Sequence, residues 1–206
     1  MKDNRLTSLR KRVAREAAAL LYSSQEKEYK QAKKRAAKTL RVRVLPSNLE
    51  VAEELDKIAE EKEGSLRRKR LLRMRKEALQ IMKTLEDFNV RLVGSVWRGT
   101  AHKNSDIDIL TFSEDPESVL DQLKKYGYKI TSSEWHSVTK EGKKESSFHI
   151  NLALSSGDEA EVIVRDLEKL GHLGRCEIYG DAVIGLSSPQ LHKILKKNPL
   201  EKFLST

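Results

Sequence analysis

Residues 94–109 read GSVWRGTAHKNSDIDI, and this stretch decides how the rest of the chain is interpreted. A glycine and a serine follow an apolar run that ends at Val93, and ten residues separate Ser95 from Asp106. Asp106 and Asp108 are two positions apart on an expected strand, so both side chains point to one face. Carboxylate oxygens are ligands that divalent cations such as Mg²⁺ prefer. The stretch therefore predicts a divalent-metal site next to a turn.

The turn has the features of an anion-binding site. Gly94 allows the backbone to approach a ligand closely, and the Ser95 hydroxyl can join nearby N–H groups in binding phosphate oxygens. Arg98 follows three residues later and adds a guanidinium, which binds phosphate well. We expect these three residues to bind phosphate groups.

Together, the Gly-Ser pair, the spacer and the Asp-x-Asp pair resemble the motif of the nucleotidyltransferase superfamily of DNA polymerase beta, poly(A) polymerases and CCA-adding enzymes. The form found here is most similar to archaeal-type CCA-adding enzymes and minimal nucleotidyltransferases, over residues 88–166. The resemblance implies an α/β (α+β) head with a mixed sheet. It also implies that two divalent ions, Mg²⁺ or Mn²⁺, support transfer of a nucleotide from an NTP to an acceptor. Asp106 and Asp108 would be catalytic and metal-binding residues, and Gly94, Ser95 and Arg98 would bind the triphosphate of the nucleotide.

The resemblance further implies a third carboxylate on a later strand. Glu161, in the alternating run 160–165, occupies the place where the family usually carries an aspartate. We expect it to be a catalytic and metal-binding residue, with a side chain one methylene longer than that of aspartate. Glu159 shares the same strand face and is the alternative. Alternatively, Glu161 is a solvent-exposed residue on an edge strand and has no role in catalysis.

Two histidines precede this strand. The resemblance places His136, in the run Glu134-Trp135-His136, among the residues that bind the triphosphate. A surface histidine on a strand is the alternative interpretation. His149 lies on an expected strand, where it either faces the active site with Glu161 or covers the sheet.

Apolar residues recur at helical spacing before residue 88 and alternate after it. This change predicts a basic helical arm over 1–45, a helical segment over 46–87 that packs on the head, and a catalytic domain over 88–206 with a C-terminal helix. A capping box at Ser47 and Glu50 marks one helix start. The expected helices cover residues 5–23, 25–40, 47–61, 66–88, 116–125 and 188–197. The expected strands cover residues 90–93, 107–111, 129–135, 148–154 and 160–164, with a turn at 155–158.

The net charge of +9 is distributed unevenly. Residues 1–45 contain 14 Lys and Arg against 4 Asp and Glu, whereas residues 87–206 contain 16 against 18. A local cationic excess of this size attracts polyanions, so an RNA acceptor of the tRNA type is the expected partner. An anionic membrane is a weaker alternative because large apolar side chains are few. The candidate nucleic-acid-binding residues are Lys30, Lys33, Lys34, Arg35 and Lys38.

Two other functions are compatible with the sequence. A minimal nucleotidyltransferase can modify a protein or a small molecule, and the arm would then contact that partner. Alternatively, the head is inactive and serves as an RNA-binding or assembly module. Cys176 is the only cysteine, which excludes an intrachain disulfide and a cysteine-based zinc site. Without a secretory pattern or a spanning apolar run, we expect a cytoplasmic protein.

Overall fold

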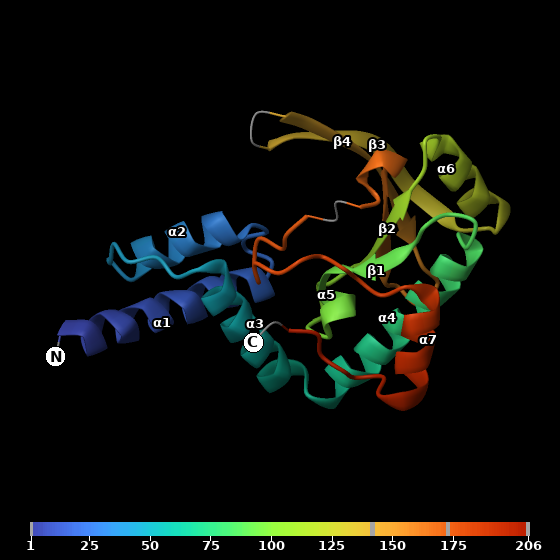
Figure 1. Ribbon diagram of the computed structural model, residues 1–206. Coiled ribbons are helices and arrows are strands. Elements are labelled where there is room, and N and C mark those ends of the chain that lie inside the picture. Colours follow the sequence, from blue (N-terminus) through green and yellow to red (C-terminus); the bar gives the residue numbers. More distant parts are fainter. Residues whose placement is uncertain (1, 141–142, 172–173, 205–206) are drawn as a thin grey trace.

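The centre of the molecule is a five-stranded mixed sheet (Figure 1). The computed structural model describes residues 2–140, 143–171 and 174–204. The strands are β1 (Arg91–Val93), β2 (Ile107–Phe112), β3 (Lys129–Lys140), β4 (Lys143–Ala153) and β5 (Glu159–Arg165). Their order is β1-β2-β5-β4-β3, and of these pairs only β2 and β5 run parallel. The expected α/β class with a mixed sheet is confirmed.

The helices fall into two groups, which we name the arm and the head. The arm contains α1 (Lys2–Tyr22), α2 (Tyr29–Thr39) and α3 (Asn48–Glu63). The head contains the sheet with α4 (Ser65–Thr84), α5 (Gly94–Arg98), α6 (Pro116–Lys125), the 3-10 turn η1 (Leu167–Lys169) and α7 (Ser188–Lys197). The arm projects to one side of the head in Figure 1. No helix in the described part of the chain has the length and apolar character needed to cross a membrane.

The core of the arm is built mostly from small side chains. Val13, Ala17, Ala32 and Ala36 have no exposed surface, and their small size lets the helices approach one another closely. Val51 of α3 belongs to the same apolar cluster. Within the segment 46–87, residues of α4 belong to the apolar cluster of the head, whereas Val51 and Ile58 of α3 belong to that of the arm.

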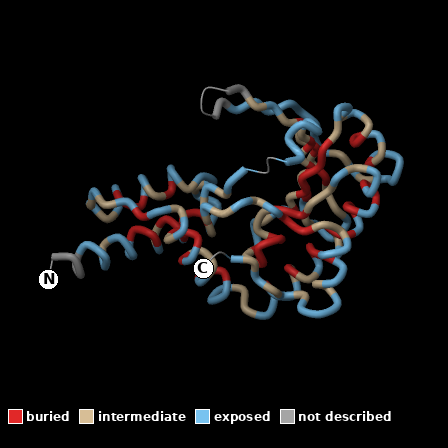
Figure 2. Tube along the Cα trace, viewed as in Figure 1, coloured by how far each residue is buried: buried red, intermediate tan, exposed pale blue. Residues whose placement is uncertain are grey.

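One face of the sheet is buried in the head and the other is half open. Met74, Ala78 and Met82 of α4 share one apolar cluster with Ile109 and Val162 of the sheet. Buried residues alternate with more exposed ones along β5, which is the pattern of a strand covered on one side. Figure 2 shows the buried positions of the head concentrated around the sheet and its helices. The half-open face is free to carry polar groups.

The expected bounds hold for α6 and α7, where Pro follows a capping residue at the helix start. The strands β3 and β4 are longer than expected, because they continue as a two-stranded ribbon past Phe148, where the pairing of β4 with β5 stops. Such a ribbon has no covered face and so leaves little alternation to detect. Helix α4 ends at Thr84 rather than residue 88, since Leu85 leaves the helical conformation.

Candidate active site

The predicted carboxylates meet on the half-open face of the sheet. Asp108 on β2 lies in register with Glu161 on β5, and the two strands are neighbours. Asp106 lies two residues before Asp108, where β2 is about to begin, and therefore points to the same side. One parallel strand pair thus brings the three sequence-predicted residues together.

The surroundings of Asp106 and Asp108 raise the pKa values of both side chains. Burial raises the pKa of Asp108 well above its usual value, and the charges of Asp106 and Glu161 raise it further. The pKa of Asp106 is raised by loss of surrounding water, with the charges of Glu161 and Glu159 adding to the effect. Raised carboxylate pKa values with identifiable charged neighbours are typical of catalytic and cation-binding sites.

Gly94 makes the close packing of Asp108 possible. A Cβ atom at this position would lie 1.8 Å from Asp108 Oδ2, which no side chain tolerates. The φ angle of Gly94 is also +68°, in the region that favours glycine. The predicted turn therefore requires glycine on two independent grounds, and it places Ser95 directly beside the carboxylates.

Glu161 has a histidine partner. The Nδ1 atom of His149 lies 2.7 Å from Glu161 Oε1, and the Ser147 hydroxyl lies 2.8 Å from His149 Nε2. Of the two interpretations of His149, the structure places it on the active-site face. His136 lies one strand further out on β3, is exposed, and stacks on His149 with 4.2 Å between ring centroids.

The donor set suits a hard divalent cation, although its ligands are not already gathered around one point. Within residues 2–140, 143–171 and 174–204, no group of three His, Cys, Asp or Glu residues is arranged to hold a metal ion. Asp106 and Asp108 nevertheless fit such an ion, because a positive charge relieves the repulsion that raises their pKa values. Glu161 would join them on releasing its hydrogen bond to His149.

The two glutamates of β5 differ in placement. Glu161 is in register with Asp108, and its charge raises the pKa of both aspartates. Glu159 is exposed next to the turn, and its charge contributes to the raised pKa of Asp106. Glu161 is therefore the better placed of the two for a third carboxylate.

The environment of Arg98 differs from the expected one. Its guanidinium donates to both carboxylate oxygens of Asp181, at 2.6 and 3.1 Å, and to the Phe203 carbonyl at 3.0 Å. The rings of Trp97 and Tyr179 lie 4.4 and 4.3 Å from its centre, and the residue is 4% exposed. The expected phosphate clamp is not part of this arrangement, because the guanidinium instead ties the turn to the C-terminal segments.

A second buried arginine holds the same turn from behind. Arg75 of α4 has no exposed surface. It donates to the carbonyls of Val96 and Trp97 in α5, at 3.1 and 2.9 Å. It also donates to the carbonyls of Pro199 and Glu201, at 2.7 and 2.8 Å. Four carbonyl oxygens thus satisfy this cation, and residues distant in sequence fix the predicted phosphate-binding turn.

A pocket of about 150 Å³ opens beside this turn. Gly94 and Ser95 line it from the head, Tyr29 of α2 and Leu55 of α3 line it from the arm, and Tyr179 lines it from the segment after β5. The arm therefore reaches the turn at Gly94 and Ser95 and forms part of the wall of this pocket.

The basic candidates on α2 lie in two different environments. Lys33 donates to Asn48 Oδ1 at 2.7 Å. Arg35 donates to Glu26 Oε1 at 3.0 Å and to the Gln25 side chain at 3.1 Å. The other three are exposed to solvent: Lys30, Lys34 and Lys38. The structure thus separates residues that the sequence grouped together.

Sequence reasoning missed Arg75, Ser147 and Asp181. Ser147 is two residues before His149, so the alternation of β4 would have placed both on one face. Arg75 and Asp181 give no local signal, because their partners lie far away in the sequence.

Residues 75–169 match the sequence model of a family described as nucleotidyltransferase domain. The matched part of the chain contains Gly94, Ser95, Asp106 and Asp108, so the resemblance to nucleotidyltransferases based on these residues is confirmed. Nucleotidyltransferase is the enzyme class that this match indicates for the head.

Several solved structures are also similar to this chain. Cid1 in complex with the UTP analogue UMPNPP is 17% identical with a TM-score of 0.34, covering 57% of this chain and 37% of that one. The GLD-2/RNP-8 complex is 15% identical with a TM-score of 0.34, covering 59% and 40%. A cytoplasmic RNA terminal U-transferase is 19% identical with a TM-score of 0.29, covering 57% and 34%. The match therefore spans well under half the length of these chains. No curated protein matches the sequence.

Proposed function

We propose that this protein is a metal-dependent nucleotidyltransferase that transfers a nucleotide from an NTP to a hydroxyl group of RNA. The observation that carries the proposal is the facing pair Asp108 and Glu161, with Asp106 beside it and Gly94 packed against Asp108. Carboxylates at this density, with raised pKa values, are arranged to receive positive charge. Mg²⁺ or Mn²⁺ supplies it by chemistry that suits oxygen ligands.

Each residue of the site then has a definite task. Asp106 and Asp108 would hold the divalent ions, which when bound neutralise the triphosphate and lower the pKa of the attacking hydroxyl. Backbone N–H groups at Gly94 and the hydroxyl of Ser95 bind phosphate oxygens. Glu161 orients the attacking hydroxyl and accepts its proton, while His149 holds the Glu161 carboxylate before the acceptor arrives.

The reaction is an in-line displacement at phosphorus. The acceptor oxygen forms a bond to the α-phosphorus, the bond from that phosphorus to the bridging oxygen breaks, and pyrophosphate leaves with the electron pair. His136 is a candidate contact for the triphosphate, because its ring lies against that of His149, the partner of Glu161. Arg98 is left out of these tasks, since Asp181 and a carbonyl occupy its donors.

The charge of the arm supports RNA as the acceptor. Residues 1–45 carry a net charge of +10, from 14 basic and 4 acidic residues, and the arm forms part of the wall of the pocket at Ser95. A polyanion attracted to the arm is therefore brought close to the turn at Gly94 and Ser95.

The direct test is transfer of label from four separate α-³²P-NTPs to size-fractionated RNA with Mg²⁺ or Mn²⁺. We expect labelled RNA and released pyrophosphate, both abolished by EDTA. Asp108→Asn serves as the matched negative control. Label on protein in place of RNA would favour the alternative of protein modification, and absence of transfer to any acceptor would favour an inactive head.

A further inference from the structure

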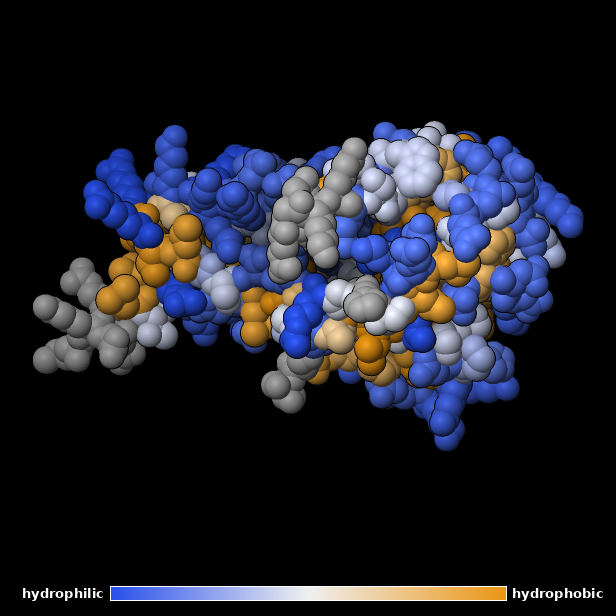
Figure 3. Space-filling model, turned by 45° about the horizontal axis from the view of Figure 1, so that its top comes forward, coloured by the Kyte–Doolittle hydropathy of each residue, from blue (hydrophilic) through white to orange (hydrophobic). Residues whose placement is uncertain are grey.

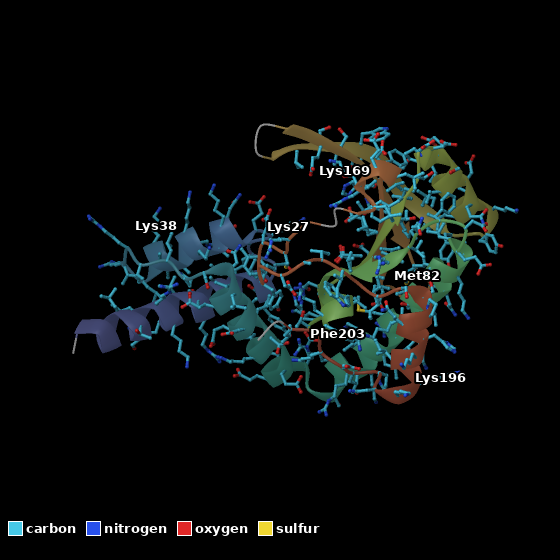
Figure 4. The ribbon with its side chains drawn as sticks, viewed as in Figure 1. Lys27, Lys38, Met82, Lys169, Lys196 and Phe203 are labelled. Carbon is cyan, nitrogen blue, oxygen red and sulfur yellow. The ribbon has the colours of Figure 1, made fainter. Side chains whose placement is uncertain are left out.

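A row of exposed lysines follows one side of α2. Lys30, Lys34 and Lys38 are spaced four residues apart and therefore lie above one another on the helix, with roughly 6 Å between neighbours. Lys27 precedes them in the same direction, and Figure 4 shows Lys27 and Lys38 at opposite ends of the row. Among the described residues, none of the four amines has an ion-pair partner. The row is thus a line of free positive charges.

The same side of α2 is hollowed. A shallow groove of about 650 Å³ runs along it, with Lys30, Lys34 and Lys38 on its lining. Hydrophilic side chains cover this region of the arm in the space-filling view (Figure 3). Two acidic residues also line the groove, but Glu26 is paired with Arg35 at 3.0 Å, and Glu28 accepts a hydrogen bond from Gln31 at 3.3 Å. The lining of the groove thus carries four basic residues against two acidic ones and keeps a net positive charge.

One end of the row lies at the pocket beside the turn of Gly94 and Ser95. Tyr29, the first residue of α2, lines the same pocket as Gly94 and Ser95. Lys27 precedes this end of the helix and Lys30 lies in its first turn. Lys38 lies about 12 Å beyond Lys30, at 1.5 Å per residue. A strand that reacts at the carboxylates and leaves along α2 would pass the lysines in order.

We propose that Lys27, Lys30, Lys34 and Lys38 form a track for the sugar-phosphate backbone of one RNA strand, just upstream of its reacting 3′ end. The inference rests on the proposed function, because the reacting end defines the direction of the strand. The exposed side chains of the row are lysines with no aromatic residue among them, so the track binds phosphates without reading bases. Lys33 and Arg35 are not part of the track, since Asn48 and Glu26 occupy them.

The experiment compares two triple variants of the full chain. The track variant carries Lys30→Gln, Lys34→Gln and Lys38→Gln. The control variant carries Lys193→Gln, Lys196→Gln and Lys197→Gln on α7, which are equally exposed and lie on the head away from the arm (Figure 4). Both variants lose the same charge, and circular dichroism verifies that both fold.

Binding of a fluorescent dodecamer of uridines is measured at several salt concentrations. Three lost contacts with a single strand reduce the slope of log K against log salt by about 2, which at ~0.1 M salt is about a 100-fold loss of affinity. We expect this loss in the track variant and less than about threefold in the control variant. Lys34→Gln alone should weaken binding more than Lys33→Gln, although the two residues are neighbours.

Equal losses in the two triple variants, or an unchanged slope in the track variant, would overturn the track. The proposed function is tested separately, by nucleotide transfer from the unaltered protein to a uridine dinucleotide that is too short to reach along the track. If the dinucleotide is a substrate and the track variant binds the dodecamer as tightly as the unaltered protein, the track is contradicted and the proposed function is not. If no acceptor is labelled and the track variant still shows the expected loss of dodecamer binding, the proposed function is contradicted and phosphate binding by the row is not.

Discussion

The arm and the head carry unbalanced charge in opposite ways. The arm spreads most of its lysines over exposed helix faces, where they are surrounded by water. The head crowds Asp106, Asp108 and Glu161 onto one strand pair, where burial and repulsion raise the pKa values of the aspartates. Spread charges attract any polyanion and are weakened by salt, whereas crowded charges favour a compact cation in one position. The comparison teaches that one chain can place a general attraction for polyanions in its arm and a specific site for a cation in its head.

Removing one of the crowded carboxylates is expected to have the largest effect. Asp108→Asn should reduce the rate of nucleotide transfer by at least about 1,000-fold, because several kcal/mol of charge stabilisation are lost from the transition state. Single-turnover transfer with labelled NTP measures the rate. Activity within tenfold of the original protein would show that the carboxylate cluster is not the reaction centre.

The same substitution should stabilise the protein in the absence of metal. A carboxyl group whose pKa is raised by folding favours the protonated form, so its contribution to stability is lost as pH rises through the raised pKa. Asp108→Asn should therefore increase the free energy of unfolding at pH 8, and the increase should shrink as pH falls toward 4. Urea unfolding in EDTA at several pH values measures this, and a destabilised variant at pH 8 would contradict it.

Glu161→Gln should have a smaller effect than the loss of an aspartate. We expect kcat to fall about 100-fold, in the range of a lost proton acceptor, while the KM for NTP changes little. Glu159→Gln is the matched control on the same strand and should stay within about threefold. Steady-state kinetics separates kcat from KM, and a larger loss in the Glu159 variant would reverse the assignment of the two glutamates.

Buried and exposed cations provide the next comparison. Arg75→Met leaves four carbonyl oxygens without their donor, so we expect a loss of about 3 kcal/mol in the free energy of unfolding. Lys34→Met on the arm should change it by less than about 0.5 kcal/mol. Chemical denaturation measures both. Similar losses at the two positions would mean that Arg75 is not held as tightly as its contacts indicate.

An exposed ion pair should have the smallest effect. Arg10 of α1 lies 2.8 Å from Glu50 of α3, with both side chains largely in solvent. We expect Arg10→Gln to lower Tm by less than about 2 °C, because such pairs contribute little. A thermal melt at low and high salt measures the effect. A larger drop would show that the arm depends on its charges for its own stability.

The sequence predicts those parts of the fold that depend on neighbouring residues. The spacing of Gly94, Ser95, Asp106 and Asp108 identifies the head, since the turn and the strand are contiguous. Alternation places Glu161 on the face of the aspartates, because β5 is covered on one side. These features are local, so short stretches of sequence contain them.

Features that depend on distant partners could not be predicted. The sequence predicts Arg98 as a phosphate ligand, because its partner Asp181 lies 83 residues away and gives no local signal. Lys33 and Lys34 are adjacent and chemically identical, yet only the packing of α3 on the arm gives Lys33 a partner in Asn48. The assignment of α3 to the arm likewise depends on which apolar faces meet, which periodicity does not specify.

The contacts of Arg98 also set an order of events while the chain is being made. The Phe203 carbonyl that accepts a hydrogen bond from Arg98 lies 105 residues later in the sequence, and ribosomes add about 5–20 residues per second. The turn at Gly94 and Ser95 therefore leaves the ribosome roughly 5–20 s before the segment that secures it. During that interval the nascent head contains the residues of the motif and the strands. It lacks the hydrogen bond from Arg98 to Phe203 that helps to hold the turn at Gly94 and Ser95. Competence to bind a nucleotide should accordingly appear late in synthesis, well after the sequence motif itself has emerged.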